Sequence, residues 1–380
     1  MDQRIRIGIV HLWSQIWHGG AYYISNLVYA LNTLPDINKP IIDIYCKTDR
    51  DFYDLQKETG YPYLVKNLIR PCFIRKAFNR IVYYFSKKLY FRTNPFRINR
   101  QDTIIYPYNC GFNSDKLIYW HPDFQDKYYP EFFSKKTIKN RDREICVVCK
   151  RNIPIVFSSY DSQRDFNSFF PQFKNNSTFV VHFAVHQQDY SEINIELLKR
   201  KFGINKPYII CANQFWKHKN HAFLFSAFKE AVDNGLDMQL VCTGKMIDYR
   251  DSGYIDELLL FVRENKLEKT ILTLGVIEKT ELLCLMKNSY AVIQPSLFEG
   301  WNTTVEDCKA MSKFLFLSDI MVHREQIEKN VCFFNPTDKE DLVNKLLTVL
   351  PKEVKIDYDL NIRRFADDFY KVIQSKNVMI

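Results

Sequence analysis

The feature that most restricts the fold of this chain is a regular alternation of short apolar runs and helical patterns in its second half. Six runs of four or five mostly apolar residues recur there, and segments with helical spacing fill the intervals. Strands separated by helices in this way form parallel, doubly wound sheets with helices on both faces. The predicted strands are residues 208–212, 239–243, 271–275, 291–294, 314–317 and 331–334.

The first half repeats this α/β design less regularly. Its apolar segments predict six strands, and residues 21–33 have the spacing of a helix. A chain of 380 residues is long enough for two domains, and the polar segment 187–205 predicts a linker. We therefore place one domain at residues 1–188 and the other at residues 189–362. The first-half strands are expected at residues 4–11, 41–46, 103–106, 116–120, 153–158 and 178–182.

Residues 289–318 form the most informative strand, helix and strand unit. A buried strand stops before Pro295, Thr303 can cap a helix that reaches about residue 313, and another strand follows. Ligands of such sheets bind at the carboxyl ends of the strands, where a helix N-terminus offers N–H groups and a partial positive charge to phosphate. Glu299 and Glu306 lie on either side of this point.

The spacing of Glu306 leaves two interpretations open. Thr303 and Glu306 fit a capping box, in which the glutamate bonds back to the backbone N–H of the cap residue. Ligand binding is the alternative. Glu299 lies between a strand end and Gly300, and no structural task explains a carboxylate there.

Three other segments follow strand ends. Gly19 and Gly20 open the helix at residues 21–33, and glycines at such a turn let backbone N–H groups approach a ligand. Residues 213–221 read NQFWKHKNH after the first strand of the second half. Residues 120–125 read WHPDFQ, with PEFF at residues 130–133, and His121 is expected where the two domains face each other. A lone histidine is as often structural as functional.

Together these segments resemble the retaining glycosyltransferases of family 4, which have the GT-B fold. The resemblance covers nearly the full length, and its most specific parts are FEGW followed by Glu306, NQFW-x-HKNH, and PDFQ followed by PEFF. Six residues separate the two glutamates, rather than the seven of the commonest family form, as in a shorter variant that reads FEGW-x-x-x-x-E. The resemblance implies two Rossmann-like domains with an interdomain cleft, and a C-terminal helix at residues 363–380 that packs back on the first, acceptor-side domain.

The resemblance also implies a function. Such an enzyme moves a sugar from a nucleotide diphosphate sugar to a hydroxyl of a glycan or lipid-linked glycan, with retention at the anomeric carbon, in surface polysaccharide synthesis. Catalytic roles are implied for Glu299 at the donor sugar, for His121 facing the sugar from the first domain, and for Lys219 at the diphosphate. The remaining donor-binding residues implied are Gly19, Gly20, Gln214, Gly244, Ile277, Gly300, Asn302, Thr303, Thr304 and Glu306, the last at the ribose hydroxyls.

This interpretation needs no cofactor and no metal, because cations and backbone N–H groups stand in for a divalent ion. Gln214 occupies the position of a family arginine, so one cation is missing, and Lys217 and Lys245 are the candidate replacements. Two other functions stay open. One is a nucleotide-sugar epimerase of the GT-B fold, and the other is a non-catalytic nucleotide-sugar binder, which Gln214 and the shortened glutamate spacing favour.

The positive charge of the chain is concentrated in one segment. The net charge is +9, and residues 61–101 hold ten Lys or Arg side chains and no Asp or Glu. Aromatic residues are interleaved with them, which a merely solvated surface would not need, and nucleic acid has no role beside a donor-sugar site. Anionic lipid headgroups attract basic segments, and aromatic side chains settle at the headgroup level. We therefore expect attachment to the inner-leaflet membrane surface through residues that include Arg75, Lys76, Lys87 and Lys88.

The sequence otherwise indicates a cytoplasmic protein. No run of 18 apolar residues predicts a membrane span, and the N-terminus lacks the apolar core of a signal peptide. The ten cysteines are dispersed, as in proteins of reducing compartments. The predicted location is the cytoplasm, with peripheral attachment to the cytoplasmic membrane face.

Overall fold

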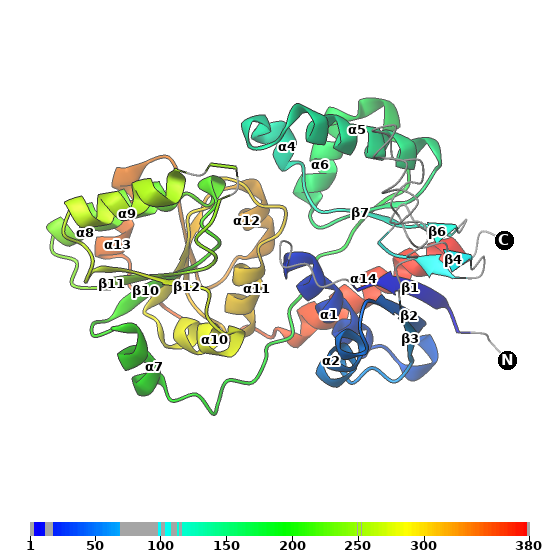
Figure 1. The fold of residues 1–380 in the computed structure, drawn as a ribbon, viewed down its shortest axis with the longest axis horizontal. Coiled ribbons are helices and arrows are strands. Elements are labelled where there is room, and N and C mark those ends of the chain that lie inside the picture. The colour runs from blue at the N-terminus through cyan, green and yellow to red at the C-terminus, as the bar shows by residue number, and fades with distance from the viewer. Residues whose placement is uncertain are drawn as a thin grey trace, which may run out of the picture.

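The computed structural model describes residues 4–11, 18–68, 98–99, 103–107, 112–113, 116–248, 250–251 and 253–377. It has two lobes, one from each half of the sequence, and the chain crosses between them twice (Figure 1). The first crossing follows β9 Thr178–Val180, and the second follows α13 Lys339–Thr348. Each lobe is built on parallel strands with helices around them, so the doubly wound α/β architecture predicted from the sequence is confirmed.

The C-terminal sheet has six parallel strands in the order β12-β11-β10-β13-β14-β15. Five strands have the predicted bounds, and β14 is displaced by one residue. Its strands are β10 Tyr208–Ala212, β11 Gln239–Thr243, β12 Ile271–Gly275, β13 Ala291–Gln294, β14 Leu315–Ser318 and β15 Val331–Phe334. Its helices are α7 Ile195–Phe202, α8 His221–Asp233, α9 Tyr254–Glu264, α10 Lys279–Asn288, α11 Thr303–Ala310, α12 Met321–Gln326 and α13, with the 3-10 helix η4 Lys217–Lys219.

Successive residues of β10 show why these strands are apolar along their whole length. Ile209 and Cys211 belong to a core that also contains side chains of α8, α9 and α13. Tyr208 and Ile210 belong to a second core, with side chains of α7, α10 and α11. Because helices cover both faces of the sheet, neither set of side chains reaches solvent, and the sequence shows a continuous apolar run.

The N-terminal sheet is also parallel. Its strands pair in the orders β3-β2-β1-β5 and β7-β8-β9, and a bridge between Ile105 and Leu117 connects the two sets. Its strands are β1 Arg6–Val10, β2 Ile41–Cys46, β3 Leu64–Leu68, β5 Ile104–Ile105, β7 Tyr119–His121, β8 Ile155–Phe157 and β9, beside a small pair formed by β4 Ile98–Asn99 and β6 Phe112–Asn113. Its helices are α1 His18–Leu31, α2 Asp49–Thr59, α4 Gln125–Tyr128, α5 Lys135–Lys150 and α6 Tyr160–Phe169, with the 3-10 helices η1 Asp36–Asn38, η2 Pro130–Phe132 and η3 Pro171–Phe173.

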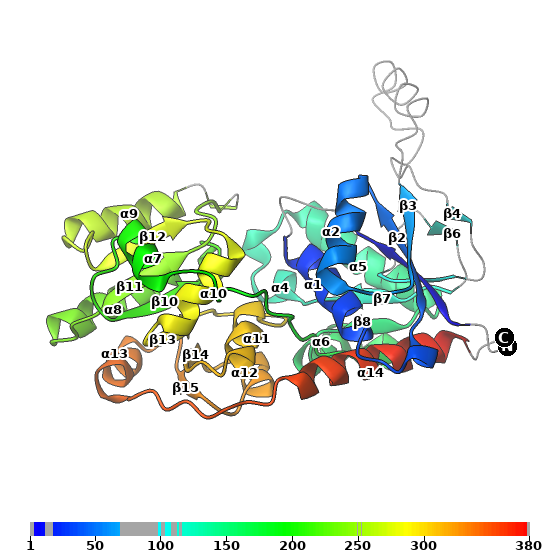
Figure 2. The same cartoon turned by 90° about the horizontal axis from the view of Figure 1, so that it is seen from below.

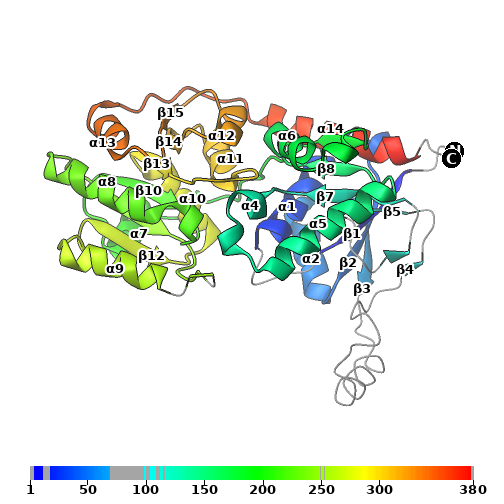
Figure 3. The ribbon, with the colours of Figure 1, turned by 90° about the horizontal axis from the view of Figure 1, so that it is seen from above.

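The last helix, α14 Asp359–Asn377, returns to the N-terminal lobe and lies along it (Figure 2). It packs against α1, and Phe365 and Phe369 are buried in the same core as Ile7 and Leu27. Helices α11 and α12 lie on the side of the C-terminal lobe that faces the N-terminal lobe (Figures 1 and 3). The loops that precede these two helices therefore approach the other lobe.

The carboxyl ends of the two central strands of the C-terminal sheet lie at the interface between the lobes. Strands β10 and β13 are neighbours, although β11 and β12 separate them in sequence. In open α/β sheets such a reversal of strand order leaves a crevice at the carboxyl ends of the two strands. The loops 213–220 and 295–302 leave β10 and β13 at this point.

Candidate donor-sugar site

A cavity of about 350 Å³ lies between the two domains at this reversal of strand order. The C-terminal domain contributes the loops after β10 and β13 and the start of α11, and the N-terminal domain contributes α1 and the residues that follow β7 and β8. Among the residues that line it are Tyr23, Trp120, Asp123, Gln214, Lys219, Glu299, Gly300, Asn302, Thr303 and Thr304.

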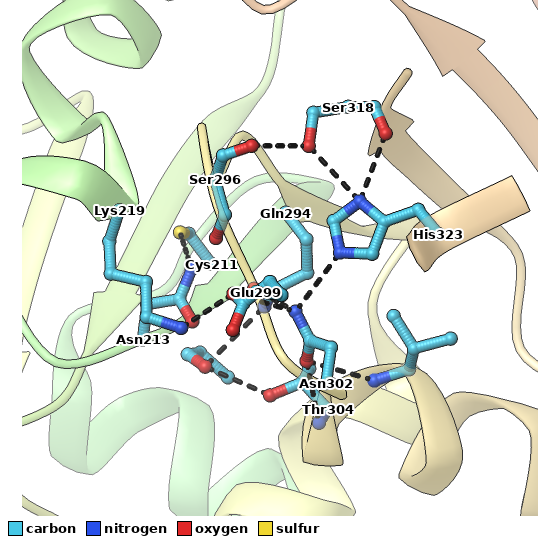
Figure 4. A network of polar contacts seen from close by, with 12 residues as sticks. Cys211, Asn213, Lys219, Gln294, Ser296, Glu299, Asn302, Thr304, Ser318 and His323 are labelled. Atoms are coloured by element: carbon cyan, nitrogen blue, oxygen red, sulfur yellow. Dashed lines mark hydrogen bonds and ion pairs between the residues drawn. The ribbon is translucent and has the colours of Figure 1, made fainter. Parts of the chain in front are cut away.

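Lys219 and Glu299 form an ion pair in this cavity. Lys219 Nζ donates to Glu299 Oε1 at 2.5 Å, and Asn302 Nδ2 donates to the same oxygen at 3.1 Å (Figure 4). The side chains of the pair are only 13% and 9% exposed, which excludes a solvated surface lysine. A cation and a carboxylate predicted from separate segments, 80 residues apart, are thus brought into contact.

Asn302, rather than Thr303, caps α11. Its Oδ1 accepts hydrogen bonds from the N–H groups of Thr304 at 2.9 Å and Val305 at 3.3 Å. The prediction of a capping box that begins at Thr303 is therefore wrong, and the helix ends at Ala310, before residue 313. Asparagine is among the strongest N-cap residues, and its backbone is extended here, with φ −99° and ψ 113°.

The new cap position changes which N–H groups can meet an anion. The N–H of Asn302 donates to Gln326 Oε1 at 3.2 Å, and the N–H of Thr304 donates to the cap side chain. Among the N–H groups of the predicted donor-binding residues Asn302, Thr303 and Thr304, that of Thr303 is thus the one without a hydrogen-bond partner in the described part of the chain. The Thr304 hydroxyl donates to the carbonyl of Ala212 at 3.0 Å and fixes α11 to the end of β10.

Glu306 does not point into the cavity. It is fully buried, and its Oε1 accepts from Lys309 Nζ at 2.9 Å and from Gln326 Nε2 at 2.8 Å. Its Oε2 accepts from the hydroxyl of Tyr358 at 2.6 Å. These contacts contradict the predicted ribose-binding role as well as the capping role, because the side chain leaves the helix on the wrong side for either.

Asp307, one residue further along α11, faces the N-terminal domain instead. Its Oδ2 pairs with Lys279 Nζ at 2.5 Å, while its Oδ1 is buried and without a partner among the described residues. Burial raises the pKa of Asp307 above the usual aspartate value, and Lys279 opposes the shift. Seven residues separate Asp307 from Glu299, which is the spacing between the two glutamates in the commonest family form.

His121 is also misplaced by the sequence interpretation. It is 3% exposed, and its ring lies 4.3 Å from that of Phe124, between centroids, in the core behind the cavity. Burial, with a smaller contribution from Arg141, lowers the pKa of His121 to about 3. The prediction that it faces the donor sugar is wrong, because strand side chains alternate and its neighbour Trp120 takes the side toward the cavity.

Trp120 was not predicted from the sequence. The alternation along β7 places Trp120 and His121 on opposite faces, but only the packing shows that Trp120 is the one that lines the cavity. Its ring stacks on that of Tyr23 with 4.1 Å between centroids, and its Nε1 donates to Ser158 Oγ at 3.1 Å. These contacts fix an aromatic wall on the N-terminal side of the cavity.

Two of the predicted glycines are required for close packing. A Cβ on Gly300 would lie 2.5 Å from the carbonyl oxygen of Pro122, so this glycine lets the two domains touch at the edge of the cavity. Gly244 has φ +142°, and a Cβ there would lie 2.0 Å from the carbonyl oxygen of Asn213. Gly244 thus supports the loop after β10.

The remaining predicted donor residues lie near the same interface. Gly19 and Gly20 fall within the first turn of α1, rather than before the helix. Ile277 is partly buried against the second core of the C-terminal domain. Gln214 lines the cavity and also a second one of about 450 Å³, which lies between α1, α2 and α10. Thr303 lines both as well, so the two cavities adjoin.

Two buried polar groups that line the second cavity lack a hydrogen-bond partner among the described residues. His11 Nδ1 is buried there, and within the described residues it has no hydrogen-bond partner; the same holds for the hydroxyl of Tyr22. Ser25 donates to Glu58 Oε2 at 2.7 Å on the opposite wall. Lys279, the partner of Asp307, also lines this cavity.

Neither candidate replacement for the missing arginine, Lys217 or Lys245, is among the residues that line the 350 Å³ cavity. Lys217 Nζ pairs with Asp251 Oδ2 at 3.0 Å, and Lys245 is exposed.

Across the described ranges, no cluster of three His, Cys, Asp or Glu side chains could hold a metal ion. In the same ranges, no helix has the length and hydropathy to cross a membrane. Arg75, Lys76, Lys87 and Lys88 lie outside the described residues.

Comparisons with known proteins agree with this geometry. Residues 194–365 match the family described as glycosyl transferases group 1. The O-antigen chain mannosyltransferase RfbU of Salmonella typhimurium is 23% identical over 225 residues, which span 58% of this chain and 55% of that protein. This chain therefore aligns with only about half the length of that curated relative.

Solved structures with the same fold cover nearly the whole chain. HepE of Anabaena, in complex with UDP and glucose, has a TM-score of 0.59 at 14% identity, with 98% of this chain and 95% of that chain covered. WaaG, a glycosyltransferase involved in lipopolysaccharide biosynthesis, has a TM-score of 0.57 at 11% identity, with 98% and 99% covered. The GT-B fold predicted from the sequence is confirmed by these neighbours.

Proposed function

We propose that this protein, a glycosyltransferase by its GT-B fold and its glycosyl transferases group 1 domain, moves a sugar with retention from a nucleotide diphosphate sugar to a glycan hydroxyl. The observation that carries the proposal is the Lys219–Glu299 pair beside the N-terminus of α11, in a cavity between two domains. The mannosyltransferase RfbU and HepE with its UDP support a donor of this class.

The diphosphate would lie between Lys219 and the start of α11. The bond to the leaving nucleotide breaks with a gain of negative charge on the diphosphate, and fixed cations and N–H groups stabilise that charge without having to reorganise. Among the described residues that line the cavity, Lys219 and the N–H of Thr303 would supply this stabilisation, and the proposal needs no metal for this step. Lys219 would then divide its hydrogen bonds between the phosphate and Glu299.

Glu299 would stabilise the opposite charge. The sugar becomes cationic as its bond to the nucleotide breaks, and a fixed carboxylate beside the ring favours that charge distribution. Asn302 and Lys219 hold Glu299 Oε1, so the carboxylate is oriented before the donor arrives. Trp120 and Asp123, which line the cavity from the N-terminal domain, would contact the sugar and the acceptor. Gly20, in the same domain, would also face the acceptor.

We place the nucleoside beyond the diphosphate, in the adjoining 450 Å³ cavity. Asp307, whose Oδ1 has no hydrogen-bond partner among the described residues, would accept hydrogen bonds from the ribose hydroxyls, the role predicted from the sequence for Glu306. The loop at residues 275–277, which precedes α10, would border the base.

The proposal is tested by a donor screen followed by a transfer assay. UDP-, GDP- and dTDP-sugars are first compared by thermal shift, because a ligand at a hundredfold excess over its Kd stabilises the fold by about 2.7 kcal/mol. The preferred donor is then incubated with and without glycan acceptors, and the product is analysed for anomeric configuration. Interconversion of the free nucleotide sugar would support an epimerase, and binding without transfer or hydrolysis would support a non-catalytic binder.

The acceptor is proposed to be lipid-linked, as part of surface polysaccharide synthesis. The support is the basic, aromatic segment at residues 66–100 in the acceptor-side domain. Each Lys or Arg near an anionic leaflet contributes about 1 kcal/mol of attraction. Sedimentation with phosphatidylglycerol vesicles should increase with the anionic fraction, decrease with salt, and be lost when Arg75, Lys76, Lys87 and Lys88 are changed to Ser. If the protein stays in the supernatant at low salt, a soluble acceptor is the better assignment.

A further inference from the structure

We infer that Tyr358 and Glu306 are positioning residues that couple the orientation of the two domains to the donor-binding loop. The inference rests on the proposed function for its effect on turnover, and on the geometry of the interdomain crossings for its mechanism. A fully buried carboxylate on helix α11 of the C-terminal domain, turned away from the cavity, is the observation that requires an explanation.

Tyr358 joins both crossings of the chain. It ends the second crossing, immediately before α14, and its side chain is buried in the N-terminal core. Its hydroxyl accepts a hydrogen bond at 2.9 Å from the N–H of Val185, which lies in the first crossing and in the same core. The same hydroxyl donates to Glu306 Oε2 at 2.6 Å. One hydroxyl thus connects the two crossings with the helix that begins at the donor site.

Gln326 connects Glu306 to Asn302, the residue that caps α11. Gln326 Nε2 donates to Glu306 Oε1 at 2.8 Å and to the carbonyl of Asn302 at 2.7 Å, and Gln326 Oε1 accepts the N–H of Asn302 at 3.2 Å. The backbone of Asn302 is therefore held on both sides by one amide group. The side chain of Asn302 in turn caps α11 and donates to Glu299.

The result is an unbroken series of hydrogen bonds from the crossings to the cavity. Its members, in order, are Val185, Tyr358, Glu306, Gln326, Asn302, Glu299 and Lys219. Buried networks of this kind have discrete arrangements rather than a continuous range, because each broken bond leaves an unsatisfied group in a low dielectric. A rotation of the domains that moves Tyr358 must therefore either move the cap of α11 with it or break a bond.

A second contact ties the same loop to the first crossing. Trp301 Nε1 donates to the carbonyl of Phe183 at 3.1 Å, and the Trp301 ring stacks on that of His182 with 4.5 Å between centroids. The donor-binding loop is thus fixed to the interdomain crossing both at Trp301 and, through Glu306, at Asn302.

The test compares Tyr358→Phe with Tyr208→Phe. Both remove one hydroxyl from a buried tyrosine, but the hydroxyl of Tyr208 donates to the carbonyl of Leu285 at 2.7 Å inside the C-terminal domain. Tyr358→Phe should lower kcat about tenfold, the effect of one hydrogen bond to a charged group, with little change in the KM for the donor. We also expect UDP or GDP to compact the wild type in small-angle scattering, and Tyr358→Phe to reduce that compaction. Tyr208→Phe should lose thermal stability without either change.

Glu306→Gln supplies a second variant that keeps the volume of the side chain and an oxygen acceptor. If the two residues act through one network, Tyr358→Phe should have a smaller effect on kcat in the Glu306→Gln background than in the wild type. Equal effects of Tyr358→Phe and Tyr208→Phe on kcat and on compaction would overturn the positioning role while leaving transfer intact. A wild type that compacts with nucleotide but never transfers a sugar would instead overturn the proposed function.

Discussion

Removal of the charge of Lys219 gives the sharpest test of the donor site. Lys219→Met keeps the length and apolar stem of the side chain but deletes the ammonium group that contacts Glu299 at 2.5 Å. We expect turnover to fall by about one to three orders of magnitude, the range for the loss of one preorganised stabilising group. Steady-state kinetics with the preferred donor measure this directly.

The same change should also destabilise the fold, for a separate reason. Glu299 is 9% exposed, and without Lys219 the one hydrogen bond left to its charge from the described residues would be the neutral one from Asn302. Breaking a buried pair by removing one partner costs about 3–5 kcal/mol, and partial exposure makes this an upper bound here. Scanning calorimetry should therefore show a Tm several degrees lower than that of the wild type.

A double variant separates the two effects. Lys219→Met with Glu299→Gln removes the unpaired charge, so the Tm should recover most of the loss while turnover stays low. Lys217→Ala is the matched control, because Lys217 pairs with Asp251 away from the cavity and should leave turnover within a fewfold of the wild type. Full activity of Lys219→Met, or recovery of activity in the double variant, would show that Lys219 does not hold the diphosphate.

Three further variants test the revised site. Asp307→Asn should weaken nucleotide binding about tenfold by calorimetric titration, as expected for the loss of one charged hydrogen-bond acceptor; unchanged affinity would remove Asp307 from the ribose. Gly300→Ala should lose about 1–3 kcal/mol and turnover, because its Cβ would meet Pro122, whereas Gly253→Ala, with no atom nearer than 3.9 Å, should be tolerated. The low pKa of His121 means that the unfolded chain takes up a proton first, so folding stability decreases as pH falls from about 6.5 to 3. His121→Phe should make this decrease shallower at unchanged turnover, and a loss of turnover would return His121 to the cavity.

The sequence alone determined the architecture of the C-terminal domain. Parallel strands buried on both faces must be apolar along their whole length, and helices must fill the connections, so five strands could be predicted to the residue. The ends of β10 and β13 were equally predictable, and Lys219 and Glu299 follow those ends directly. The contact between Lys219 and Glu299 requires β10 and β13 to be neighbours in the sheet. The alternation of strands and helices along the chain already favours such a strand order.

Only the tertiary structure decided how the side chains of adjacent residues are buried and which of them line the cavity. Successive residues of a helix are rotated by about 100°, so the choice between Glu306 and Asp307 depends on where α11 begins and what surrounds it. Asn302, which caps the helix, donates its backbone N–H to Gln326, 24 residues away in the chain. The hydroxyl of Tyr358 donates to Glu306, which is 52 residues away. His121 and Trp120 lie on opposite faces of β7. The packing of His121 against Phe124, a contact between elements, leaves Trp120 as the side chain that faces the cavity. Local sequence therefore predicted the strands of the C-terminal domain to within a residue, while partners distant in the chain decided how each of two adjacent side chains is buried.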